Sequence, residues 1–322
     1  MTEHPSSRLS RRDVLRLAAT CGGYLALLRH ADPLRALRIQ ATAVGEVVAT
    51  EPFARLERVA DGVWAAISTP LEGDRTTLCN GGIVAGRDGV LVVDGFASAE
   101  GARWLAGWAK QLAGRWPDEV VLTHYHGDHS AGLEGYDGAG EPPRYRSTEA
   151  TRERLQSGRA RTRRQGEILG EMGGLDAQSA SEIDLGGRVV RVLPRSGHTS
   201  SDVTVELDDP SVVFCGDLVW NQMFPNYMDA TPSRLSSSVR ALRRQRETVY
   251  VPGHGPLADA TDFDRYLMAI DSVEEAARAA HQRGEDLAAA ARTFRLPEEI
   301  ADWVLFSPTY FEVAFSRWKL EL

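Results

Sequence analysis

The sequence predicts an α/β protein, because short apolar strands alternate along it with amphipathic helices. Three strand-like runs come first, at residues 63–67, 80–85 and 89–93. Residues 99–113 then have the periodicity of a helix with one apolar face, and Gly114 and Pro117 end it. A further strand-like run follows at 120–123, and the alternation resumes in looser form after Ile183.

Length and composition limit the possible classes of protein. The 322 residues suffice for one large domain with appended segments, and apolar and charged fractions of 43% and 25% are typical of a soluble globular protein. The net charge of −8 argues against a nucleic-acid-binding surface. The three cysteines, Cys21, Cys79 and Cys215, are scattered and odd in number, so no disulfide framework is expected.

The N-terminal segment, residues 1–43, is predicted to be an export signal. Arg11 and Arg12 stand in a stretch that resembles a twin-arginine motif, and an apolar run at 15–28 follows. This run is too short for a stable membrane span and fits the apolar region of a signal peptide. Residues 41–43, Ala-Thr-Ala, offer a cleavage site. We therefore expect a periplasmic or extracellular protein; a basic amphipathic helix that stays in the cytoplasm is the alternative.

Five of the eight histidines stand in three short motifs. The motifs are His124-Tyr125-His126-Gly127-Asp128-His129, Gly197-His198-Thr199 and Pro252-Gly253-His254. Asp217 lies between the last two motifs, just after the apolar run 212–214. Imidazole and carboxylate are the ligands that zinc and related metals prefer, and one structural ion needs fewer of them. The pattern therefore predicts a site for two metal ions.

The first motif can by itself address two ions. Residues i and i+2 of an extended segment point to the same side, so His124 and His126 can reach one ion. Gly127 lets the chain turn, and Asp128 and His129 then fall at the start of a predicted helix, where they can face a second ion. The alternative, a polar strand edge without metal, is disfavoured because similar ligands recur elsewhere in the chain.

These motifs resemble those of the metallo-β-lactamase superfamily. Residues 124–129 match its His-x-His-x-Asp-His signature, while His198, Asp217 and His254 stand where the family places its other ligands. A strand-like run that ends at Asp94 resembles its first motif.

The resemblance spans about residues 56–257 and implies a fold. A four-layer αββα sandwich is expected over residues 52–258, followed by a C-terminal helical extension over 259–322. Three aromatic residues of this extension share one helical face: Phe311, Phe315 and Trp318. That face is expected to pack within the core or to form a homodimer contact.

The resemblance also implies the roles of the residues. One zinc ion would be held by His124, His126 and His198, the other by Asp128, His129 and His254, with Asp217 as the bridge. Iron or manganese could replace zinc. A hydroxide between the ions would attack the carbonyl of a small-molecule ester, thioester, lactone or lactam, and Asp128 would help to orient it. Asp94 is expected to support a ligand imidazole.

Two alternatives to this function remain open. In having a carboxylate at position 217, the chain resembles the glyoxalase II and lactonase branches of the family. The zinc β-lactamases lack a carboxylate at this position. A persulfide or thiol dioxygenase with a single iron shares much of the motif. A binding protein without catalytic activity is the third hypothesis, which the complete ligand set disfavours.

The substrate pocket is harder to predict. Four residues that follow Asp217 are candidates to line it: Trp220, Asn221, Phe224 and Tyr227. They could equally pack under the C-terminal helices. Residues 149–172, which contain six arginines, could form a basic lid over the substrate, although a solvated helix face is the more ordinary interpretation.

Overall fold

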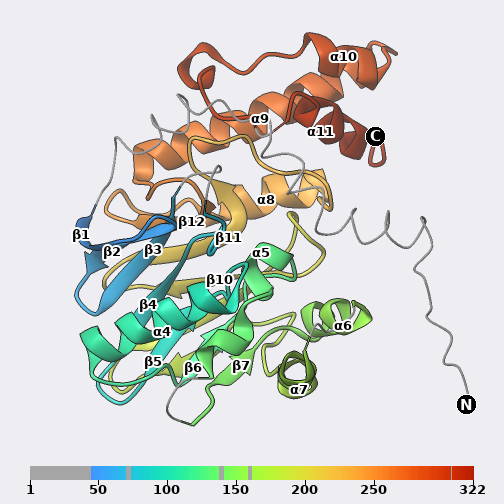
Figure 1. The fold of residues 1–322 in the computed structure, drawn as a ribbon. Helices are drawn as coiled ribbons and strands as arrows, with labels where there is room; N and C mark the ends of the chain where they lie inside the picture. The colour runs from blue at the N-terminus through green and yellow to red at the C-terminus, as the bar shows by residue number, and fades with distance from the viewer. Residues whose placement is uncertain (1–44, 70–73, 138–140, 159–161, 306) are drawn as a thin grey trace, which may run out of the picture.

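The computed structural model describes residues 45–69, 74–137, 141–158, 162–305 and 307–322. The predicted export signal, residues 1–43, lies outside the described residues. Two β-sheets face each other, and helices cover the outer side of each (Figure 1). This arrangement confirms the predicted αββα sandwich.

The first sheet has seven strands in sequence order. Their bounds are β1 (Glu46–Thr50), β2 (Ala54–Ala60), β3 (Val63–Ser68), β4 (Gly81–Ala85), β5 (Val90–Val93), β6 (Glu119–Val121) and β7 (Arg144–Arg146). Neighbours from β1 to β5 are antiparallel, whereas β5 with β6 and β6 with β7 are parallel. A parallel pair needs a crossover connection, and helix α4 (Ala99–Ala113) provides it between β5 and β6. Ser98 caps this helix and Gly114 ends it in a left-handed conformation.

The second sheet has the order β12-β11-β10-β9-β8. Its strands are β8 (Ser181–Asp184), β9 (Val189–Arg195), β10 (Asp202–Leu207), β11 (Val212–Trp220) and β12 (Val249–His254). All neighbours are antiparallel except β11 and β12, which are parallel and are connected through helix α8 (Pro232–Leu242).

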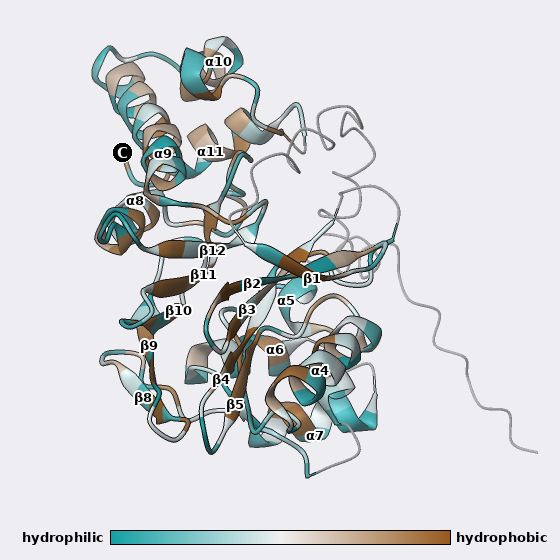
Figure 2. Ribbon diagram, turned by 90° about the vertical axis from the view of Figure 1, so that its left-hand side faces the viewer, coloured by the Kyte–Doolittle hydropathy of each residue, from teal (hydrophilic) through white to brown (hydrophobic). Residues whose placement is uncertain are grey.

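Three apolar clusters fill the spaces between the four layers. Strand β5 shows how the sequence produces them. Its alternate residues Leu91 and Val93 face the second sheet, while Val90 and Val92 pack with helix α4. A strand covered on both faces must be apolar throughout, and Figure 2 shows this hydrophobic character in β4, β5 and β11.

The short helix α5 (Gly127–Ser130) carries the end of the first histidine motif, and the other helices lie on the outer faces. Beside the first sheet are η4 (Leu133–Tyr136), α6 (Glu149–Ser157) and α7 (Arg163–Glu171), and beside the second are α9 (Ala260–Gln282), α10 (Leu287–Thr293), η5 (Glu298–Ile300) and α11 (Tyr310–Trp318). The aromatic face of α11 packs inside the chain: Phe315 and Trp318 are buried, and Phe311 contacts Phe294. Within the described residues, no helix combines the length and apolarity that a membrane crossing requires.

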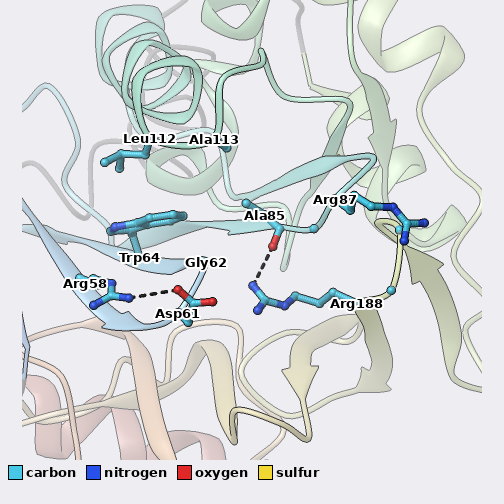
Figure 3. A pocket seen from close by; sticks show the side chains of 12 residues that line it. Arg58, Asp61, Gly62, Trp64, Ala85, Arg87, Leu112, Ala113 and Arg188 are labelled. Atoms are coloured by element: carbon cyan, nitrogen blue, oxygen red, sulfur yellow. Dashed lines mark hydrogen bonds and ion pairs between the residues drawn. The ribbon is translucent and has the colours of Figure 1, made fainter.

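The topology gathers the predicted ligands at one edge of the sandwich. Residues 124–129 follow β6, His198 follows β9, Asp217 lies within β11 and His254 ends β12, while the predicted supporting residue Asp94 follows β5. The pocket of Figure 3 lies at the opposite end, between the turns that precede β3, β5 and β9. It is lined by other residues, among them Arg58, Arg87 and Arg188.

Candidate metal centre

The ligand motif after β6 is held at both ends by one carboxylate. Asp94 accepts hydrogen bonds from the backbone N–H of Thr123 at 2.8 Å and from its hydroxyl at 2.9 Å. Its other oxygen lies 2.8 Å from Nδ1 of His129. Asp94 has a positive φ of 65°, a conformation that few residues other than glycine adopt. The chain therefore turns sharply after β5 and presents this carboxylate to the motif.

Four residues form the first of two ligand clusters. Potential ligand atoms of His124, His126, His198 and Asp217 lie within 4.8 Å of one another. Nδ1 of His126 is 2.9 Å from Nε2 of His198, which is in turn 3.3 Å from Oδ2 of Asp217. Nε2 of His124 is 3.8 Å from the same oxygen, and this buried nitrogen has no hydrogen-bond partner among the described residues. Three imidazoles and one carboxylate oxygen thus converge on a single point.

The second cluster shares Asp217 with the first. Oδ1 of Asp217 lies 3.0 Å from Nε2 of His129 and 3.2 Å from Nε2 of His254. Oδ2 of Asp128 is 3.3 Å from the same nitrogen of His254. Asp217 therefore directs one oxygen to each cluster. The seven predicted ligands come together in an arrangement consistent with a binuclear metal site.

The protonation states of His198 and Asp217 suit metal binding. At His129 and His254, nearby acidic groups raise the pKa against the effect of burial, so an ion that binds these two must displace a proton. Burial lowers the pKa of His198 to about 3, so its imidazole is neutral at physiological pH. Burial opposes ionisation of Asp217, but the rings of His254 and His129 outweigh it and hold the pKa of this carboxyl well below its usual value. Neutral imidazoles and ionised carboxylates are the forms that bind metal ions. The residues therefore fit the ions that the clusters imply.

Comparisons with known proteins agree with this geometry. The sequence profile of the Metallo-beta-lactamase superfamily matches residues 75–254. The chain belongs to this superfamily. A hydroxyacylglutathione hydrolase of Acidiphilium cryptum is 32% identical over 206 residues, which cover 62% of this chain and 74% of that protein.

Solved structures show the same fold. A metallo-β-lactamase from Pontibacter korlensis matches with a TM-score of 0.56 and 21% identity over 68% of this chain and 99% of its own. One from Erythrobacter litoralis matches with a TM-score of 0.54 and 20% identity over 69% and 98%. The family and the ligand clusters together make this chain a metallo-hydrolase of the metallo-β-lactamase superfamily.

The loop that carries His198 is folded around the buried carboxylate of Asp202. Asp202 accepts hydrogen bonds from the backbone N–H of His198 at 3.1 Å and from the Thr199 hydroxyl at 2.6 Å. Burial raises the pKa of Asp202 to about 7, against the hydrogen bonds from Thr199. Gly197 is required beside it, because a Cβ there would lie 2.3 Å from the backbone of Leu235.

The turn that carries His254 is held by the first sheet. Asn80 donates from its side-chain amide to the carbonyl oxygens of Pro252 at 2.9 Å and Gly255 at 2.8 Å. Gly253 allows this turn to approach β11, because a Cβ there would lie 2.0 Å from Oδ1 of Asp217. The second ligand cluster therefore depends on a glycine and an amide that do not bind metal.

Two further residues beside the clusters were not predicted. Cys79 lies with Asp94 and His129 within 4.8 Å, and burial raises the pKa of its thiol to about 12. Asp229 lies 3.0 Å from Nε2 of His126 and accepts a hydrogen bond from the Tyr125 hydroxyl at 3.1 Å. Neither stands in a recognisable motif, so only the fold reveals these contacts.

The four residues considered for the substrate pocket lie in the interior, as the alternative of packing under the C-terminal helices predicts. Trp220, Asn221, Phe224 and Tyr227 are all buried. Trp220 packs on the ring of His254, with centroids 4.0 Å apart, and Phe224 contacts Phe311 of α11. Asn221 donates to the carbonyl oxygens of the turn after His254. These large side chains support the centre from beneath the C-terminal helices and do not line an open pocket.

The arginine-rich segment forms the two helices α6 and α7. Most of its described arginines pair with nearby carboxylates: Arg152 with Glu149, Arg163 and Arg164 with Glu167, and Arg164 also with Asp137. Arg154 differs, because its guanidinium lies 5.3 Å from the ring centroid of Tyr125, next to the ligand His126. Among the arginines of this segment that the structure describes, only Arg154 therefore lies close to a ligand of the metal centre.

Proposed function

We propose that the chain is a zinc-dependent hydrolase that cleaves a carbonyl substrate with the help of two metal ions. The observation that carries the proposal is the placement of Asp217, with one oxygen directed to each ligand cluster. A shared carboxylate of this kind would hold two ions together. Two such ions supply a hydroxide nucleophile at neutral pH and a Lewis acid that polarises the carbonyl.

The chain's own residues have separate tasks in this proposal. His124, His126 and His198 hold one ion, and Asp128, His129 and His254 hold the other. Asp128 also orients the attacking water, because it lies on the partly exposed side of the centre. Asp94 keeps the His129 imidazole in place through its Nδ1.

An acyl thioester is the first substrate class to test. Support comes from the relative named hydroxyacylglutathione hydrolase, with which the chain shares 32% of residues over 206 positions. The carboxylate at Asp217 also suits this branch. Esters, lactones and lactams remain the comparison substrates.

Metal analysis combined with activity profiling tests the proposal. We expect two zinc ions per chain, loss of thioester hydrolysis on chelation and its return when zinc is added. Iron or manganese would be identified in the same analysis. A metal content that stays at one ion per chain during zinc titration would overturn the two-metal proposal. Oxygen uptake with a persulfide, without hydrolysis of any ester or thioester, would replace the hydrolase by a dioxygenase.

We also propose that the protein is exported by the twin-arginine route. The support is the pair Arg11-Arg12 followed by a short apolar run. Replacing both arginines by lysine is expected to retain the protein in the cytoplasm with unchanged metal content. Fractionation of the unaltered protein with the cytoplasm would contradict export.

A further inference from the structure

A short segment of the second half of the molecule reaches the first ligand cluster. Residues 227–231 are the last part of the connection from β11 to α8, and Asp229 lies in the middle of them. One oxygen of Asp229 is 3.0 Å from Nε2 of His126. The opposite nitrogen of this ring, Nδ1, lies 2.9 Å from Nε2 of His198 in the cluster. The imidazole of His126 therefore stands between the cluster and this carboxylate.

The segment itself is fixed in place from two sides. The backbone N–H of Thr231 donates to the carbonyl oxygen of Gly197 at 2.9 Å, next to the ligand His198. Arg317 of α11 donates to the carbonyl oxygen of Ala230 at 2.8 Å. Because the two residues that follow the carboxylate are tied to other parts of the fold, Asp229 is not a freely moving surface residue, although 41% of its side chain is exposed.

An imidazole that binds a metal ion through one nitrogen carries a proton on the other. A carboxylate that accepts this proton fixes the tautomer and the ring orientation, and it makes the bound nitrogen a better ligand.

Each ligand cluster contains a histidine whose second ring nitrogen contacts a carboxylate. In the second cluster, Asp94 contacts the rear nitrogen of His129 at 2.8 Å. In the first, Asp229 contacts the rear nitrogen of His126 at 3.0 Å. Asp94 follows β5 of the first sheet, whereas Asp229 comes from the second half of the chain. Both histidines of the pair belong to the same six-residue motif, and each has a carboxylate behind it.

We propose that Asp229 is a positioning residue that holds His126 in the orientation and tautomer needed to bind the first metal ion. This inference rests on the proposed two-metal function. It predicts that Asp229 affects the affinity of one ion rather than the folding of the chain. Tyr125 donates to the same carboxylate but carries no ligand atom, so its hydrogen bond should matter little for the metal.

The test compares three variants of the full chain: Asp229→Ala, Asp229→Asn and Tyr125→Phe. Each is titrated with Zn²⁺ against a chelating indicator. Asp229→Ala is expected to weaken one of the two ions on the order of 10–100-fold. Asp229→Asn keeps the shape but loses the charge, so its loss should be smaller. Tyr125→Phe should bind both ions as the unaltered protein does.

A spectroscopic measurement reports the hydrogen bond directly. In the Co²⁺-loaded protein, exchangeable imidazole N–H protons give strongly shifted NMR signals. One of these signals should be lost or exchange rapidly in Asp229→Ala and persist in Tyr125→Phe. A residue that only stabilised the segment would leave this signal in place.

The outcomes separate this inference from the function on which it rests. Failure of the unaltered protein to bind two ions would remove the proposed function. If it binds two and Asp229→Ala binds both with equal affinity, only the role of Asp229 is overturned. The same holds if Tyr125→Phe reproduces the loss. Should the alanine variant not fold, Asp229→Asn and its N–H signal decide the question.

Discussion

At the scale of single residues, the metal centre depends on close contacts as much as on ligands. Gly253 brings the turn of His254 against Asp217, at a distance that no side chain permits. Asp94 and Asp202 accept hydrogen bonds from the backbone of the ligand loops. Without these bonds the loops would be free to move. The ligands are therefore placed by residues that never touch a metal ion.

Gly253→Ala is expected to abolish binding of at least one ion and hydrolysis with it. The added methyl group would lie 2.0 Å from Oδ1 of Asp217, so the bridging carboxylate must move. Gly107→Ala is the matched control, because its Cβ meets nothing within 4 Å. In the middle of α4 it should stabilise the protein by about 0.5–1 kcal/mol. Metal titration and thermal unfolding of both variants make the comparison.

Asp217→Ala should lower turnover and metal content together, since one residue serves both clusters. The fold is expected to persist, because the apolar layers are independent of this side chain. Asp94→Ala removes the acceptor behind His129 and should cost about 10–100-fold in affinity or activity. Retention of two ions and near-normal turnover by Asp217→Ala would show that it does not bridge. Steady-state kinetics and metal analysis on the same samples measure both effects.

At the scale of elements, the sequence was informative where local pattern and burial coincide. Helix α4 has the predicted bounds, because its amphipathic pattern is unambiguous and clear stop signals follow it. The short strand β7 was not predicted, since three residues carry too little pattern. The surroundings of the residues after β11 could not be decided from the sequence for a different reason. Large apolar residues look alike whether a ligand or a later helix covers them, and α11 begins about ninety residues after β11 ends.

Phe315→Ala in α11 tests how firmly the C-terminal extension is attached. The side chain is buried and packs against Phe294, so its loss should cost about 3–5 kcal/mol of unfolding free energy. Leu320→Ala is the control, because this leucine is 74% exposed and should change stability little. Denaturant unfolding of the two variants gives the values. Equal stability would mean that α11 is not part of the cooperative core.

At the scale of the whole molecule, each ligand cluster draws on both halves of the chain. His124 and His126 come from the first half, while His198 comes from the second. His129 and His254 are divided in the same way. The histidine motif made this assembly predictable, but the supporting carboxylate Asp229 was not, because its position depends on the path of the chain in space.

Metal removal should therefore destabilise the molecule as well as inactivate it. An ion that binds only the folded chain adds about 2.7 kcal/mol at a free concentration one hundred times its dissociation constant. Thermal unfolding with and without a chelator is expected to show a lower Tm for the metal-free protein. Restoring zinc should return the original Tm, and an unchanged Tm after chelation would contradict the expectation.

The division of the ligands between two halves has a consequence for fragments of this protein. Residues 176–180 form an exposed connection between the two sheets, and a cut there would leave each piece with an incomplete coordination sphere for either ion. Separate pieces should be inert, and zinc capture should appear only after they dock. The enzyme could thus serve as a split reporter, in which hydrolysis signals that two fused partners have met.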